Sequence, residues 1–143
     1  MNSKNILNKL PYTKPFLFVD HLLSVTEDRA EGAYTFREDE YFYKGHFKDN
    51  PVTPGVILVE CMAQVGLVCL GIFLLKDTET ENIQIALSSH QVDFYKPVFP
   101  KEKVTVISEK EYFRFNKLKC NVKMLNEVGD VVAKGTISGM LKY

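Results

Sequence analysis

The sequence lacks the features that mark several common classes of protein. Lysine plus arginine equals aspartate plus glutamate, 18 each in 143 residues, so charge favours neither nucleic-acid nor membrane-surface binding. It contains no glycine-rich phosphate loop and no dinucleotide fingerprint. The histidines His21, His46 and His90 do not have the mutual spacing of a metal site. We therefore expect no metal and no cofactor.

Cysteine is also scarce, and its spacing does not indicate disulfides. Cys61 and Cys69 fall in a predicted helix and Cys120 in a predicted strand, which favours buried thiols in a reducing compartment. The first residues contain no apolar core of a signal peptide. We therefore expect a cytoplasmic protein.

One long apolar stretch is present, and it predicts a helix from Val56 to Leu75. Twenty helical residues could cross a bilayer, at about 1.5 Å each. Glu60 and Gln64 oppose that interpretation, because an acidic residue inside a membrane helix costs about 2.5–3.5 kcal/mol. A helix that is apolar on nearly every side is otherwise one buried in a core. We expect no membrane span.

The rest of the chain reads mainly as strands. Two strands are predicted before the helix, one within 15–25 and one at 29–36. The run at 15–25 is either a strand buried on both faces or the entry into a strand. A polar surface loop is expected at 76–82. Four strands are predicted after this loop, at 83–87, 104–115, 117–124 and 131–141. The first of them is followed by an extended segment at 92–95. One substantial helix among six strands predicts an α+β fold, with a curved antiparallel sheet around a central helix in a single domain over 1–143.

The segment before the helix contains groups suited to proton transfer beside a carbonyl. His46 carries an imidazole, the commonest proton-transfer group, in a turn shaped by glycine and proline. At the helix start, the free amides of Gly55 and Val56 could stabilise the oxyanion of a thioester. Glu60 lies among apolar neighbours that favour its protonated form, and Gln64 could bond it or line a pocket. Each residue alone also has an ordinary structural explanation, as a loop histidine, a satisfied carboxylate or a turn.

Three segments then carry a resemblance to a known family. The residues Gly45-His46-Phe47, Pro51-Val52-Thr53-Pro54-Gly55-Val56 and Glu60-Cys61-Met62-Ala63-Gln64 resemble the signature of 3-hydroxyacyl-[acyl-carrier-protein] dehydratases of type II fatty acid synthesis. Residues 10–20 and 92–100 resemble two further motifs of that family. The sequence departs from the pattern at Lys48, where proline is usual, at Thr53, where methionine is common, and at 88–91.

The resemblance implies a hot-dog fold and a cofactor-independent dehydratase. His46 would take the C2 proton, Glu60 would help the C3 hydroxyl leave, and the Gly55 amide would hold the thioester oxygen. It also implies a homodimer, in some members a trimer of dimers, in which His46 of one chain faces Glu60 of the other. The substrate would arrive on acyl carrier protein, in a fatty acid or specialised polyene pathway. The acyl tunnel would be lined by aromatic side chains, namely Phe47, Phe94, Tyr95 and Phe99.

Two further expectations concern the partner and the alternatives. Because carrier protein is acidic, a basic rim is expected from Lys96, Lys101, Lys103, Arg114, Lys117 and Lys119. A hot-dog thioesterase that uses Glu60 to activate water is the alternative enzyme. A non-catalytic acyl-binding subunit that keeps the same fold is the third hypothesis.

Overall fold

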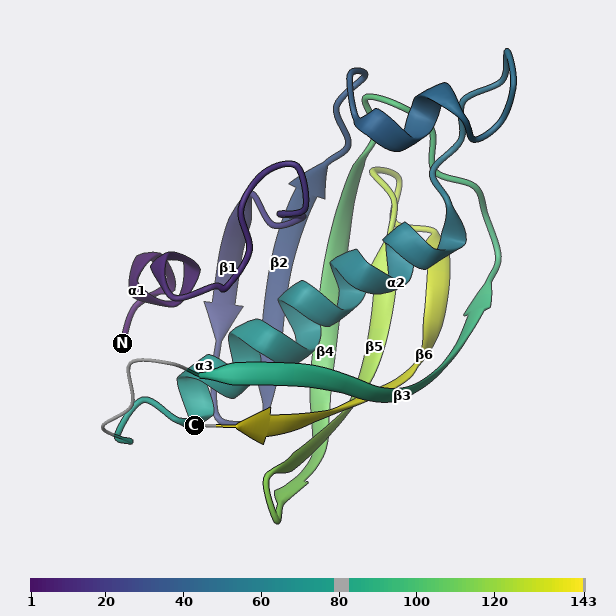
Figure 1. Cartoon of the computed structure of the whole chain (residues 1–143). Coiled ribbons are helices and arrows are strands. Elements are labelled where there is room, and N and C mark those ends of the chain that lie inside the picture. The colour runs from purple at the N-terminus through teal and green to yellow at the C-terminus, as the bar shows by residue number, and fades with distance from the viewer. Residues whose placement is uncertain (79–82, 143) are drawn as a thin grey trace.

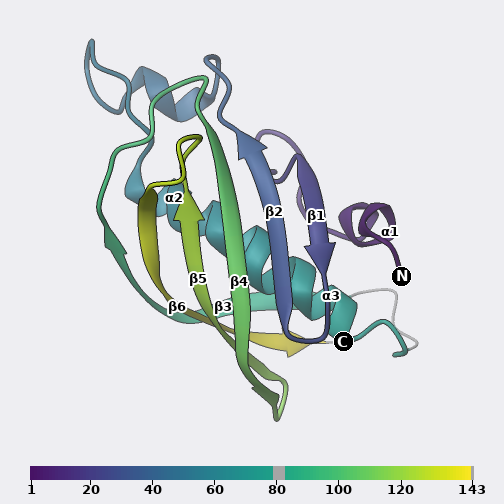
Figure 2. The same ribbon diagram turned by 180° about the vertical axis from the view of Figure 1, so that it is seen from behind.

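A computed structural model describes residues 1–78 and 83–142 of the chain. Its helix crosses one face of a curved sheet (Figure 1). From behind, the strands lie in front of the helix (Figure 2). The sheet has six strands in the order β1-β2-β4-β5-β6-β3, and every neighbouring pair is antiparallel. The predicted α+β arrangement, two strands, one long helix and four strands, is confirmed. The strands are β1 His21–Val25, β2 Arg29–Thr35, β3 Gln84–Phe94, β4 Lys103–Arg114, β5 Lys117–Leu125 and β6 Val131–Lys142.

The central helix has three consecutive parts, α2 Gly55–Ala63, the π-helical η2 Gln64–Cys69 and α3 Leu70–Leu74. A side chain at Gly66 would place its Cβ 2.9 Å from Cβ of Ser108 on β4, so glycine lets the helix approach the sheet closely. The Ser108 hydroxyl donates to the Gly66 carbonyl at 2.8 Å. The sequence predicted one regular helix, and its periodicity gave no sign of the π-helical turn.

Burial identifies this helix as the core of the fold. Gly55–Leu74 is long and apolar enough to cross a membrane, but 83% of its apolar stretch is buried inside the protein. This agrees with a core helix of a soluble domain. Burial is incomplete at the start, because Val56 is 76% exposed. The cytoplasmic location stays a prediction.

The strands nearest the two edges of the sheet differ from their predicted form. β1 begins only at His21 and is mostly exposed. Of the two interpretations of 15–25, the strand buried on both faces is therefore wrong, and the entry into a strand is the one that the structure shows. Phe18 and Val19 are buried in the preceding loop, which explains the apolar run. β3 is one continuous strand that includes 88–91, and it ends at Phe94 before two prolines. Part of the predicted 76–82 loop, at 79–82, lies outside the described residues.

Smaller elements complete the fold. The short helix α1, Ser3–Asn8, is capped by Asn2, whose side chain accepts from the Asn5 amide at 2.9 Å. The 3-10 helix η1, Tyr41–Lys44, follows β2 and leads into the loop that carries His46. All three cysteines are free and buried, as predicted. Burial raises the pKa of the Cys69 thiol to about 12 and that of Cys120 to about 11.

Candidate active site

His46 lies in the loop between η1 and α2, and hydrogen bonds hold both its backbone and its ring. Its Nδ1 is 2.9 Å from the Val52 carbonyl oxygen, and the Val52 amide donates to the His46 carbonyl at 2.9 Å. A carbonyl only accepts, so Nδ1 carries a proton and the neutral ring keeps its lone pair on Nε2. The Phe47 ring stacks on the imidazole with centroids 3.8 Å apart, across a cis peptide bond. The free nitrogen of this base is therefore Nε2.

Five predicted site residues line one hollow of about 390 Å³. They are His46, Phe47, Gly55, Phe94 and Tyr95. The other lining residues come from the same three segments, the His46 loop, the first turns of α2 and the chain after β3, and are Val52, Thr53, Leu58, Lys96 and Pro97. The hollow therefore joins the imidazole to the start of the helix.

The central helix begins beside this hollow, which Gly55 lines. The Pro54 carbonyl accepts from Ile57 at 3.0 Å and from Leu58 at 3.1 Å, so the amides of Gly55 and Val56 precede the first intrahelical donors. A Cβ on Gly55 would lie 3.2 Å from the Phe94 ring, so a side chain here would require that ring to shift. Val56 itself does not line the hollow.

Glu60 and Gln64 occupy a different position. Gln64 is fully buried, and its Nε2 donates to Oε2 of Glu60 and to the Phe16 carbonyl, each at 3.0 Å. Its Oε1 accepts from the Phe18 amide at 2.8 Å. Of the two roles predicted for Gln64, the structure shows the bond to Glu60. Glu60 is half-buried and lies near Tyr12 of the N-terminal segment. The burial of Tyr12, and after it the charge of Glu60, raise the pKa of Tyr12 to about 12.

Within one chain, Glu60 does not line the hollow that contains His46. Glu60 follows Gly55 by five residues, which at about 100° each turns it about 140° around the helix. Glu60 lies instead on the same side of the helix as Val56, which precedes it by four residues and is exposed. The two side chains to which the sequence assigned the chemistry therefore do not line one hollow of a single chain.

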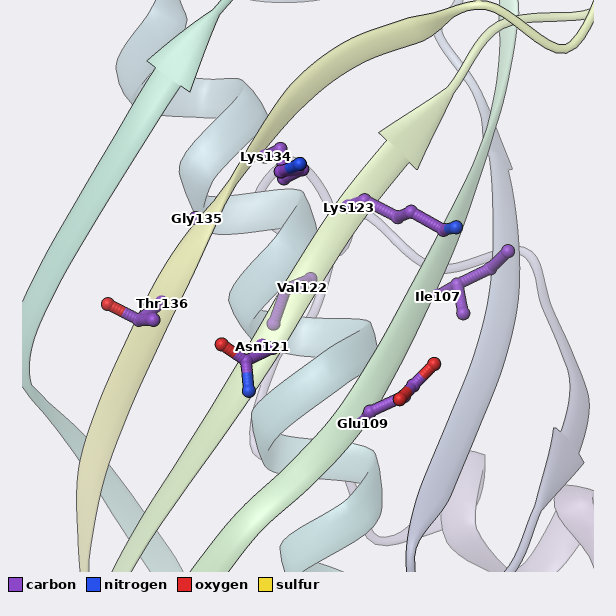
Figure 3. A pocket seen from close by; sticks show the side chains of 8 residues that line it. All are labelled: Ile107, Glu109, Asn121, Val122, Lys123, Lys134, Gly135 and Thr136. Carbon is purple, nitrogen blue, oxygen red and sulfur yellow. The ribbon is translucent and has the colours of Figure 1, made fainter.

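A second hollow, of about 350 Å³, lies on the outer face of the sheet (Figure 3). Its side chains come from β4, β5 and β6, with the central helix behind them (Figure 3). They are Ile107, Glu109, Asn121, Val122, Lys123, Lys134, Gly135 and Thr136. None of the predicted catalytic or substrate-binding residues is among them, so the chemistry is assigned to the His46 hollow. Within 1–78 and 83–142, no group of three His, Cys, Asp or Glu side chains could hold a metal.

Sequence reasoning missed a set of buried polar residues beneath the His46 loop. Glu40, which follows β2, is buried and accepts from the Tyr34 hydroxyl and from the Arg37 amide. The Tyr43 hydroxyl lies 2.6 Å from Oγ1 of Thr53, and both side chains are buried. Only the unusual threonine at position 53 gave a signal in the sequence.

The six basic residues predicted as a rim do not gather within one chain. Lys96 lines the hollow, where its Nζ bonds Oδ2 of Asp130 at 2.7 Å and lowers the pKa of that carboxyl. Lys103 and Arg114 stand at opposite ends of β4, which at about 3.3 Å a residue separates them by roughly 35 Å. A basic surface at the hollow can therefore use only part of the set from the same chain.

Sequence relatives agree on one family. A family model described as a FabA-like domain matches residues 10–137. The chain is 36% identical over 104 residues to a 3-hydroxyacyl-[acyl-carrier-protein] dehydratase FabZ of Petrotoga mobilis, covering 73% of this chain and 72% of the relative. It is 31% identical over 145 residues to the protein of that name in a Wolbachia of Brugia malayi, covering 99% and 97%.

Solved structures share the fold at low sequence identity. The dehydratase heterocomplex ApeI:P from Xenorhabdus doucetiae has a TM-score of 0.82 at 13% identity, covering 96% of this chain and 91% of that one. A hypothetical thioesterase with coenzyme A from Streptococcus pneumoniae has a TM-score of 0.68 at 12% identity, covering 97% and 95%. The fold is the hot-dog fold of dehydratases and thioesterases. On the match over residues 10–137, the chain belongs to the FabA-like family.

Proposed function

We propose that this chain dehydrates (3R)-3-hydroxyacyl-[acyl-carrier-protein] to the trans-2-enoyl thioester, without a cofactor. Family membership and the FabZ dehydratase relatives support the reaction. The observation that carries the assignment of the base is the 2.9 Å bond between Nδ1 of His46 and the Val52 carbonyl. It leaves Nε2 as the proton acceptor in a hollow shared with the helix start.

The first half of the reaction removes a proton beside the thioester carbonyl. Nε2 of His46 takes the C2 proton, and negative charge develops on the thioester oxygen. The Gly55 amide, at the positive end of the helix dipole, donates a hydrogen bond to that oxygen. The rings of Phe47, Phe94 and Tyr95 line the same hollow and give the acyl chain an apolar path.

The second half expels water. Protonated Glu60 gives its proton to the C3 hydroxyl as the C3–O bond breaks, and the electron pair from C2 forms the C2–C3 double bond. Gln64 holds Glu60 by its 3.0 Å bond and so fixes the direction of the acid. His46 then releases its proton to solvent and Glu60 takes one up from solvent, which restores both groups for the next turnover.

A homodimer would bring His46 and Glu60 together. β3 is an edge strand whose side chains are largely exposed, and large apolar residues are exposed along it, directly after it and near the helix start. These residues are Phe47, Val56, Leu87, Phe94 and Tyr95. Burying them between two copies would stabilise a dimer and remove an open sheet edge. In this dimer His46 of one chain faces Glu60 of the other, and assembly of three such dimers stays a prediction.

A dimer formed through β3 would also bring basic residues of the two chains close together. The hairpin between β4 and β5 lies at the end of the sheet where β3 begins, since Lys117 pairs with Met140 and Gln84 with Lys142. Two β3 edges paired antiparallel would therefore set the hairpin end of one chain beside the His46 end of the other. A basic surface for an acidic carrier protein would then come from both chains.

The test is an assay of purified protein with a series of 3-hydroxyacyl carrier-protein thioesters of different chain length. Formation of the conjugated enoyl thioester, lost in a His46→Ala variant, is the expected result. Full activity of that variant would refute the assignment of the base. Free acid and thiol instead of enoyl thioester would make the protein a thioesterase, and no product from folded dimer would favour a non-catalytic acyl-binding subunit.

A further inference from the structure

We propose that Tyr43 and Thr53 are positioning residues for His46, an inference that rests on the dehydration proposed above. The Tyr43 hydroxyl oxygen lies 2.6 Å from Oγ1 of Thr53. Tyr43 belongs to η1, and Thr53 stands directly before Pro54 and the helix. The bond therefore joins the two ends of the segment 44–52, which carries His46.

The segment between these ends has little packing of its own. From 44 to 51, every residue except His46 is exposed. Phe47 and Asn50 exchange backbone bonds of 2.9 and 3.0 Å, which close the tip without attaching it to the body of the protein. At the base, Tyr43 and Thr53 are only 6% and 5% exposed. The buried hydroxyl pair therefore fixes a loop that solvent otherwise surrounds.

Thr53 lies in the chain between the residue that bonds His46 and the glycine that begins the helix. The carbonyl of its neighbour Val52 accepts from Nδ1 of His46, and the Val52 amide donates to the His46 carbonyl. Two residues further on, Gly55 provides the first helical amide. The Thr53 amide also donates to the Val98 carbonyl at 2.9 Å, which ties this point to the chain after β3. A shift of Thr53 would therefore move the imidazole relative to the helix amide.

The hydroxyl pair is a feature of this chain beyond its family motif. Methionine is common at position 53 in the pattern that the sequence resembles, and a thioether is only a weak acceptor. Threonine provides a hydroxyl that can both donate and accept. Loss of either partner leaves the other buried hydroxyl unpaired, whereas a serine at 53 keeps the bond.

The experiment compares Tyr43→Phe, Thr53→Val and Thr53→Ser with the wild type. Steady-state kinetics use a 3-hydroxyacyl thioester, and nitrogen NMR of the His46 ring reports which nitrogen carries the proton. We expect the first two variants to lower kcat about tenfold with KM within about twofold, because small displacements of a reacting group slow chemistry steeply. In the same two variants we expect the His46 ring to populate both tautomers. Thr53→Ser should keep the wild-type kcat and the wild-type tautomer.

Ser108→Ala is the matched control, because it removes another buried hydroxyl bond, to Gly66, away from the His46 loop. It should lower stability and leave kcat and the His46 tautomer unchanged. The proposal is overturned if Tyr43→Phe and Thr53→Val fold and keep both readouts, or if Thr53→Ser falls as far as Thr53→Val. Absence of enoyl product from the wild type would instead refute the proposed function, while the NMR comparison still decides the role of the hydroxyl pair.

Discussion

Gln64 joins Glu60 to the segment that precedes β1. Its Nε2 donates to Oε2 of Glu60 at 3.0 Å, while its Oε1 accepts from the Phe18 amide at 2.8 Å. Because Phe18 is completely buried, that amide has no access to water. One side chain therefore satisfies a core donor and directs the carboxyl group to which we assign the acid role.

Removal of this amide should affect both stability and rate. Gln64→Ala leaves the Phe18 amide unpaired, so we expect the free energy of unfolding to fall by about 1–3 kcal/mol. We also expect kcat to fall about tenfold, because Glu60 loses the bond that orients it. Urea unfolding and steady-state kinetics measure the two effects. Asn121→Ala, on the exposed outer face of the sheet, is the control. Equal effects in both variants would contradict the role given to Gln64.

Buried tyrosines predict a loss of stability in alkali. Burial raises the pKa of Tyr12 and of Tyr43 to about 12, from an ordinary value of 10.0. Between those values the unfolded chain loses the two protons and the folded chain keeps them. The stabilisation is complete below pH 10 and disappears as the pH rises through about 12. Urea unfolding at several pH values should show this decline, and Tyr12→Phe should make it shallower. An unchanged slope in that variant would contradict the prediction.

Charge reversal at the hollow should weaken the interaction with carrier protein. Lys96 lines the hollow and pairs with Asp130, and its half-exposed side chain leaves the ammonium group open to an acidic partner. Lys96→Glu should raise KM for a carrier-protein substrate and leave KM for a small thioester unchanged. Lys134→Glu, on the outer face of the sheet, should change neither. An equal rise for both substrates would place Lys96 in acyl binding instead.

The fold could be predicted from the sequence where local pattern and burial agree. The strict alternation around Cys120 and Val122 predicted β5, and both residues are buried in the core. The apolar run at Phe18 was ambiguous, because a loop packed under a helix and a buried strand have the same composition. The π-helical η2 bonds β4 through Gly66 and Ser108, and no local pattern of the sequence indicated it.

Motif and spacing predicted the residues of the candidate site, whereas only the family resemblance implied how they are arranged across two chains. Motif and spacing selected His46, Gly55 and Glu60. They could not show that Glu60 lies outside the His46 hollow within one chain, since that depends on the helix rotation set by the sheet. The bond between Tyr43 and Thr53 was equally hidden, because it links two residues whose side chains meet only after the loop folds.

The most direct test of the account mixes two inactive variants. His46→Ala and Glu60→Gln protein would be unfolded together in equal amounts, refolded and assayed for enoyl thioester. If each site takes His46 from one chain and Glu60 from the other, a mixed dimer contains one intact site, and random pairing restores about a quarter of wild-type activity. The account predicts that recovery. Activity no higher than that of either variant alone, from dimers shown to have mixed, would contradict a site shared between two chains.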